Sequence, residues 1–150
     1  MPAHLYNELS SRFPDRSKVA FELQDGSRHT YGDVEAGAAR FAGALVALGV
    51  EPGDRVAVQV EKTLEAVLLY LGCARAGAVF LPLNTAYTPA ELEYFLTDAE
   101  PRVFVCDPRR KDSLAGAAAA AEVAHVETLG ADGKGSIAER AASMPAILSG

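Results

Sequence analysis

The sequence has few of the residues that most often carry chemistry, since its 150 residues include only two cysteines and three histidines. Cys73 and Cys106 lie far apart within apolar runs, which favours buried small hydrophobic side chains over a disulfide or a metal site. His4, His29 and His125 lie in separate segments without a cysteine or carboxylate at ligand spacing, which argues against a metal centre. We therefore predict no metal-ligating residue.

Basic residues are also scarce, because 14 Lys and Arg stand against 20 Asp and Glu, giving a net charge of −6. This balance argues against nucleic acid or an anionic membrane as a partner, since both require basic patches. Residues 1–9 contain polar side chains where a signal peptide has its apolar core. The longest apolar stretch, residues 64–83, contains Glu65, Arg75 and a glycine break, so no membrane span is expected. A cytoplasmic protein is the default expectation.

Motifs for nucleotide binding and nucleophilic catalysis are absent as well. No Gly-x-Gly-x-x-Gly follows a predicted strand, and no Gly-x-Ser-x-Gly marks a hydrolase nucleophile. Residues 130–136 form a Gly- and Lys-rich loop, but they lack the spacing of a phosphate-binding P-loop, which favours a solvated connection. Arg109, Arg110 and Lys111 are interpreted as a solvated face near a helix start. These motifs predict no catalytic residue and no cofactor-binding residue.

The composition that remains is that of one globular domain, with 49% hydrophobic and 23% charged residues. The clearest pattern lies in residues 61–101. Residues 62–76 have the apolar spacing of a helix, and Gly77 is expected to end it in the left-handed conformation because glycine lacks a Cβ atom. The predicted core face of this helix consists of Leu64, Val67, Leu68, Leu71 and Ala74, and Leu69 and Tyr70 are expected to widen it, so that the helix is covered on more than one side.

The next helix is predicted over residues 89–98. Thr88 and Glu91 have the spacing of a capping box, and Pro89 occupies the first helical position, where no N–H group is needed. The predicted buried side of this helix consists of Leu92, Phe95, Leu96 and, in part, Tyr94.

The N-terminal third is predicted to contain two helices and a hairpin. Residues 4–13 have the pattern of a short amphipathic helix. Residues 19–23 and 28–31 favour a β-hairpin that turns at residues 25–26, which are Asp-Gly. A long helix is expected to extend from there to Leu48.

This long helix is predicted to be capped by Thr30, with Asp33 near its positive end. It contains Gly37 and Gly43, and each interior glycine costs a helix about 1 kcal/mol relative to alanine. We therefore expect close packing of both glycines against a neighbouring element.

Strands and helices alternate through the rest of the chain. Strands are predicted at residues 55–60, 79–81, 103–106 and 125–129, a helix at 110–122, and a last helix from a capping box at 136–139. Residues 146–148 resemble the start of a further strand. Repeated βα units predict an α/β fold: an open, mostly parallel sheet with helices on both faces, preceded by an N-terminal helix and a β-hairpin.

One polar loop, residues 84–87 (Asn-Thr-Ala-Tyr), is a candidate ligand contact. It follows the carboxyl end of a predicted strand, where open α/β sheets place their ligands. Turn formation and entry into the next helix explain the same residues, so both interpretations stay open.

The stretch from residue 61 to 108 resembles the N-terminal region of adenylate-forming acyl-CoA synthetases, and within them the malonyl-CoA synthetases (malonate–CoA ligases). The segments that carry this resemblance are residues 30–33, 53–56, 75–78, 81–84 and 84–88. The last of these, Asn-Thr-Ala-Tyr-Thr, resembles the malonate branch. The resemblance extends from about residue 5 to residue 148 and concerns scaffold segments.

The resemblance implies a two-step ligase reaction in the full-length family. A carboxylate attacks the α-phosphate of ATP to give an acyl-adenylate and pyrophosphate, and the CoA thiol then displaces AMP; Mg²⁺ neutralises the phosphates. The family's phosphate loop, ribose contact and catalytic lysine come after the segments present here. The resemblance therefore implies that residues 1–150 are the N-terminal part of the large domain, truncated before the phosphate loop, and no catalytic or cofactor residue is assigned to any position.

Two other hypotheses remain besides an N-terminal synthetase piece that is inactive alone. The chain could be a stand-alone binding or assembly module derived from such an enzyme, or a gene fragment without function. If later domains of the parent are missing, the helix at 62–76 is expected to expose an apolar face that favours self-association.

Overall fold

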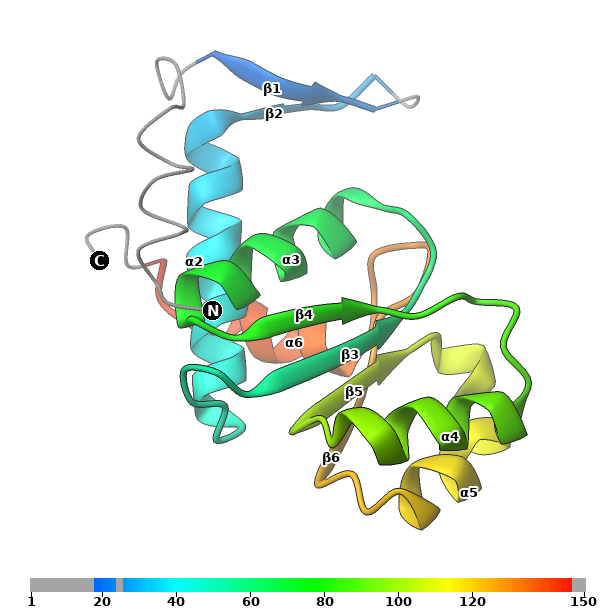
Figure 1. Cartoon of the computed structure of the whole chain (residues 1–150). Helices are drawn as coiled ribbons and strands as arrows, with labels where there is room; N and C mark the ends of the chain where they lie inside the picture. The colour runs from blue at the N-terminus through cyan, green and yellow to red at the C-terminus, as the bar shows by residue number, and fades with distance from the viewer. Residues whose placement is uncertain (1–17, 24–25, 147–150) are drawn as a thin grey trace.

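The computed structural model describes residues 18–23 and 26–146. The predicted helix at 4–13, Asp25 of the hairpin turn and residues 147–148 of the strand expected at 146–148 lie outside these ranges. Within this part of the chain, a four-stranded parallel sheet lies between two layers of helices (Figure 1). The predicted α/β class is confirmed.

The sheet has the strand order β4-β3-β5-β6, and its three neighbouring pairs are all parallel. The bounds of its strands are Arg55–Gln59 for β3, Val79–Pro82 for β4, Val103–Cys106 for β5 and His125–Thr128 for β6. The central strand β5 is buried at all four positions, as the apolar run Val-Phe-Val-Cys predicts. The sequence placed each of these strands to within one residue at either end.

Helices cover both faces of the sheet, as predicted. On one face, α2 (Tyr31–Ala47), α3 (Leu64–Ala76) and α6 (Ser136–Ala142) pack on a core that includes Val56 and Val105. On the other face, α4 (Pro89–Ala99) and α5 (Lys111–Ala120) pack on Ala57 and Phe104. Because successive strand residues point to opposite faces, β3 and β5 supply side chains to both cores.

A two-stranded antiparallel hairpin precedes the sheet. It consists of β1 (Val19–Glu22) and β2 (Arg28–Thr30), and it lies near the start of α2, apart from the main sheet (Figure 1). The Thr30 side chain accepts a hydrogen bond from the Asp33 N–H, and the Asp33 carboxylate accepts one from the Thr30 N–H. This reciprocal cap confirms the predicted start of α2.

The predicted close packing of the α2 glycines is also confirmed. A Cβ atom at Gly37 would lie 2.8 Å from Cδ1 of Leu68, and one at Gly43 would lie 3.2 Å from Cγ of Met144. At the end of α3, Gly77 has φ of 76°, the left-handed cap that the sequence predicts. Thr88 and Glu91 form the predicted capping box of α4.

The predicted core face of α3 is partly wrong. Its buried residues are Leu69, Gly72, Cys73 and Ala74, so Leu69 and Ala74 agree with the prediction. Leu64, Leu68 and Leu71 are half-buried, whereas Val67 is 37% exposed and Tyr70 is 43% exposed. The reason is that α3 lies against α2 at Gly72, where the small residue permits a close approach of the two helices. The buried face is therefore centred near Gly72 rather than on Leu64, Leu68 and Leu71.

Tyr94 and Ser136 also differ from expectation. Tyr94 is 69% exposed, because Leu92 and Leu96 lie one turn apart toward the sheet and Tyr94 falls on the opposite side of α4. Ser136 does not cap α6, because the N-cap position is occupied by Gly135, which has no side chain to accept a hydrogen bond. The Ser136 hydroxyl instead accepts from the Thr128 N–H at 2.8 Å.

The two cysteines are free and buried, which confirms the favoured interpretation. Burial raises the pKa of the Cys73 thiol to about 12 and that of Cys106 to about 11. Across residues 18–23 and 26–146, no helix combines the length and apolar character needed to cross a membrane. In the same residues, no cluster of three or more His, Cys, Asp and Glu side chains is arranged to hold a metal ion.

Candidate functional site

At the carboxyl edge of the sheet, the connections that follow the adjacent strands β3 and β5 lead to opposite faces. After β3 the chain enters α3 on one face, and after β5 it enters a short 3-10 helix, η1 (Pro108–Arg110), and α5 on the other face. The two adjacent strands therefore send their connections apart, and a crevice opens between them. Its cavity of about 150 Å³ is lined by Gln59, Val60, Glu61, Thr85, Asp107, Arg109 and Arg110.

Gln59 is the last residue of β3 and is only 2% exposed. Both the nitrogen and the oxygen of its side-chain amide make hydrogen bonds across this edge of the sheet. Nε2 donates to the carbonyl oxygen of Asn84 at 2.8 Å, and Oε1 accepts from Nη1 of Arg110 at 3.1 Å. A buried amide without these partners would carry a desolvation cost of about 1–3 kcal/mol.

Arg110 is the residue on which the sequence interpretation was wrong. Arg110 is half-buried as a residue, and besides Gln59 its guanidinium donates to the carbonyl oxygens of Thr85 at 2.8 Å and Tyr87 at 3.2 Å. The expected solvated charge therefore lies inside the crevice, because η1 directs it toward the loop after β4. Arg109 remains exposed, in agreement with the expectation.

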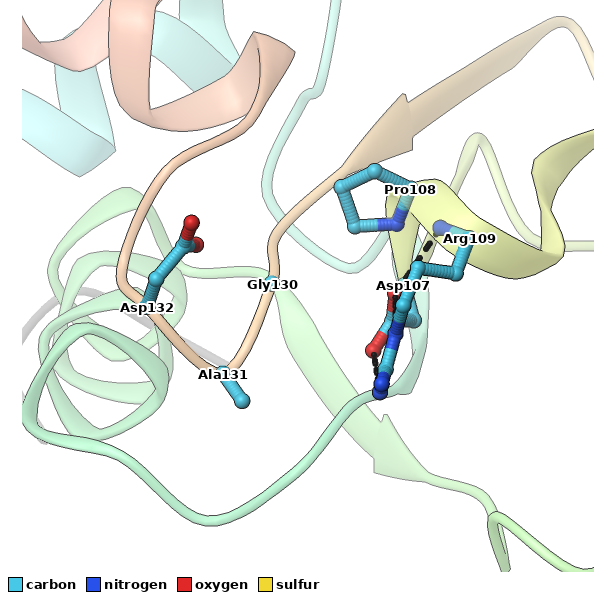
Figure 2. Close-up of a pocket in the computed structure, with 6 residues that line it drawn as sticks. All are labelled: Asp107, Pro108, Arg109, Gly130, Ala131 and Asp132. Atoms are coloured by element: carbon cyan, nitrogen blue, oxygen red, sulfur yellow. Dashed lines mark hydrogen bonds and ion pairs between the residues drawn. The ribbon is translucent and has the colours of Figure 1, made fainter.

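Asp107 and Arg109 form a close ion pair at the start of η1 (Figure 2). Arg109 donates from Nε and Nη2 to the two carboxylate oxygens of Asp107 at 3.1 and 2.8 Å, and its N–H donates to Oδ1 at 2.9 Å. The Arg109 side chain thereby holds the pKa of the Asp107 carboxyl below its usual range. The Asp107 carboxylate therefore opposes the positive charge of Arg109 at this edge of the sheet.

The loop after β6 forms the far wall of a neighbouring cavity. This cavity has a volume of about 270 Å³ and is lined by Asp107, Pro108, Arg109, Gly130, Ala131 and Asp132 (Figure 2). Within residues 130–136, the N–H groups of Gly130, Gly133 and Lys134 donate to other atoms of the same loop. These N–H groups are committed within the loop, as in the connecting loop that the sequence favours.

The candidate loop at residues 84–87 is brought only partly into the crevice. The Asn84 side chain folds back onto the loop, since its Oδ1 accepts from the Ala86 N–H at 2.8 Å. The Tyr87 ring stacks on the Phe95 ring, with the ring centroids 4.6 Å apart. Of the four loop residues, only Thr85 lines the crevice between β3 and β5. Asn84 and Thr85 also line a second cavity of about 530 Å³ with Val60, Phe80 and Leu83 among its other walls. Turn formation is thus observed, and the ligand role remains a prediction.

Sequence reasoning missed Gln59, Asp107 and Arg110 as site residues. Gln59 was included in a strand without comment, although a polar residue that ends an otherwise apolar strand is a usable signal. Asp107 is likewise a polar residue, and it directly follows the end of β5. Arg110 could not be assigned from its neighbours, because only the fold brings it to the 84–87 loop. The crevice is suited to hold polar groups in place, and in the described chain no histidine or cysteine lines it.

The fold is that of the N-terminal part of an AMP-binding enzyme. Residues 7–145 match the family model described as AMP-binding enzyme, and the chain belongs to this family. Its resemblance to the N-terminal region of the adenylate-forming acyl-CoA synthetases, and within them to the malonyl-CoA synthetases, is confirmed.

Individual relatives agree with this assignment. The chain is 48% identical to MatB from Rhodopseudomonas palustris, with a TM-score of 0.91 over 98% of this chain and 29% of that structure. It is 32% identical to a probable CoA ligase, CCL9, from Humulus lupulus, over 89% of this chain and 25% of the relative. It is 30% identical to an oxalate–CoA ligase from Arabidopsis thaliana, over 81% of this chain and 24% of the relative. The chain thus spans about a quarter of the length of these relatives.

Proposed function

We propose that this chain supplies the N-terminal α/β part of an ATP-dependent acid–CoA ligase, and that malonate is the acid. The observation that carries the proposal is the 48% identity to MatB over 98% of the chain, with a TM-score of 0.91. One structure of that protein is described as ATP-bound. The malonate-like segment at residues 84–88 supports the choice of acid, and the likeness to an oxalate–CoA ligase supports a small dicarboxylic acid.

The crevice between β3 and β5 is by itself small for ATP. The crevice between β3 and β5 has a volume of about 150 Å³, below the roughly 300–1,000 Å³ typical of ligand pockets. Arg109 is paired with Asp107, and three N–H groups of the loop after β6 are committed within that loop. We infer that the 150-residue chain is inactive alone and that ATP, Mg²⁺ and CoA are bound chiefly by other parts of the ligase.

The first test uses the purified chain with ATP, Mg²⁺, malonate and CoA. We expect neither AMP nor malonyl-CoA above the background without enzyme. Turnover that depends on both malonate and CoA would overturn the inference that the chain is inactive alone.

The second test asks whether the chain can serve as a ligase part. This chain replaces the corresponding N-terminal segment of Rhodopseudomonas palustris MatB, and release of AMP is measured with malonate and CoA. We expect an active chimera, because the two segments share 48% of their residues and the same backbone. A folded but inactive chimera would count against the proposed function.

The alternative is a stand-alone binding or assembly module. The observation that favours it is the small, polar crevice, in which Arg109 is paired with Asp107. If this alternative holds, the chain should capture a partner from cell extract while its chimera with MatB remains inactive.

A further inference from the structure

Two side chains of the crevice, Gln59 and Arg110, connect three elements that are distant in sequence. Gln59 ends β3, Arg110 ends η1, and both donate to main-chain carbonyls of the loop at residues 84–87. We propose that this pair, the 59–110 clamp, is a positioning device that fixes the 84–87 loop in the conformation that the ligase reaction requires. The catalytic part of the proposal rests on the proposed function, whereas the part about loop conformation does not.

The clamp provides hydrogen-bond donors for most of the main-chain carbonyls of the loop. Three of the four loop carbonyls, those of Asn84, Thr85 and Tyr87, accept from the two clamp side chains. The loop's own hydrogen bonds are local, since the N–H groups of Ala86 and Tyr87 donate to Asn84. The clamp therefore determines where this local turn lies relative to β3 and η1.

The chemistry of arginine suits this role better than that of lysine. Nη1 of Arg110 donates to Gln59 and Thr85, and Nη2 donates to Tyr87, so one rigid plane holds three acceptors at once. A lysine ammonium is a single point on a flexible chain and cannot reproduce this planar arrangement. The Arg110 acceptors in the described residues are neutral oxygens, so its charge strengthens each hydrogen bond without the cost of a second buried ion.

The position of the loop explains why its conformation matters for a reaction. The loop lies at the carboxyl edge of the sheet, beside the switch point at which open α/β sheets bind ligands. Thr85 lines both the crevice and the larger cavity beside it, so a shift of the loop changes both walls. Misplacement of a positioning group by about 1 Å can lower a reaction rate by about 100-fold.

The test compares variants of the MatB chimera by activity and by hydrogen exchange. Arg110→Ala and Arg110→Lys should both lower kcat/KM for malonate by about 10- to 100-fold. Both should also increase exchange of the amides of residues 85–88, while amides of β3 and β5 stay protected. The matched control is Arg55→Ala, because Arg55 also donates to a main-chain carbonyl, that of Ala99, but at the opposite end of β3.

A second variant isolates the glutamine half of the clamp. Gln59→Glu keeps the acceptor for Arg110 and removes the donor to Asn84, with little change in side-chain volume. We expect the same increase in loop exchange and a smaller loss of kcat/KM than for Arg110→Ala. This variant, like Arg110→Lys, keeps the test decisive should the alanine variant fail to fold.

The outcomes separate this inference from the proposed function. Activity and loop exchange equal to those of the Arg55→Ala control in the Arg110 and Gln59 variants would overturn the clamp. An inactive parent chimera would count against the proposed function, and loop exchange alone would then decide the clamp. Rescue of activity by Arg110→Lys would overturn the role of the planar guanidinium.

Discussion

Gly72 of α3 lies so close to Phe41 of α2 that a Cβ atom built on the glycine would be 2.7 Å from Cβ of the phenylalanine. The same atom would lie 3.0 Å from the main-chain nitrogen of Ala42. Because main-chain atoms cannot rotate away, this contact fixes how closely the two helices approach and which side of α3 is buried.

Because Gly72 makes this close contact and Gly116 of α5 has no neighbour within 4 Å, replacing each by alanine should have opposite effects on stability. Gly72→Ala should lower the free energy of unfolding by about 1–3 kcal/mol, because the added methyl group overpacks the α2–α3 contact. Gly116→Ala in α5 should raise it by about 0.5–1 kcal/mol, because a Cβ atom there meets nothing within 4 Å and alanine favours the helix. Urea unfolding of both variants measures the difference; equal effects of the two changes would contradict the close contact.

The sequence predicted the elements well because their signals are local. The caps at Thr30 and Thr88, the glycine end of α3 and the apolar strands depend on neighbouring residues only. The side of α3 that is buried depends on a second helix far away in sequence. The periodic leucines therefore predicted the correct element and only part of its buried face.

The same distinction explains the candidate site. The 84–87 loop could be identified because it directly follows a strand. Arg110 was interpreted as a solvated charge because the three oxygens that it contacts belong to residues 59, 85 and 87. Separations of 23 to 51 residues carry no periodicity, so these contacts become visible only in the fold.

Ser136 provides a test of a contact that the sequence assigned wrongly. Ser136→Ala should lower the free energy of unfolding by about 1–3 kcal/mol, because the buried N–H of Thr128 loses its acceptor at 2.8 Å. Ser143→Ala is the control, since its hydroxyl donates to the Arg140 carbonyl at an exposed position, and a change within about 0.5 kcal/mol is expected. If the two variants unfold alike in urea, the Ser136–Thr128 contact contributes nothing specific.

The Asp107–Arg109 pair predicts a loss of stability in acid. The pKa of Asp107 is lowered in the folded protein, chiefly by hydrogen bonds from the Arg109 side chain, and its unfolded value is about 3.9. The folded state thus binds this proton more weakly, so the stabilisation is complete above pH 3.9 and is lost as the pH falls through the lower folded pKa.

Thermal unfolding between pH 6 and pH 3 measures this contribution. Asp107→Asn should reduce the fall in Tm below pH 4 relative to the unchanged chain. Asp33 has a lowered pKa as well, chiefly from the Thr30 N–H, so part of the fall should persist. An identical pH profile for the Asn variant would contradict a stabilising role of the Asp107 carboxylate.

The exposed side of α3 predicts self-association of the 150-residue chain. Val67 is 37% exposed and Tyr70 is 43% exposed, and the Tyr70 ring contacts Phe80 of β4 edge-on at 5.3 Å. Within the described residues, β4 pairs with β3 alone, so an unpaired strand edge lies beside this apolar patch. Such a combination favours association of chains in water.

Light scattering across a range of concentrations tests this prediction. The unchanged chain should gain mass as its concentration rises, and Tyr70→Lys should shift the association to a higher concentration, because a charge then lies on the patch. Tyr94→Lys is the matched control, since Tyr94 is 69% exposed on α4, which covers the other face of the sheet. A clean monomer at all concentrations, or equal effects of the two lysine variants, would show that the α3–β4 patch does not drive association.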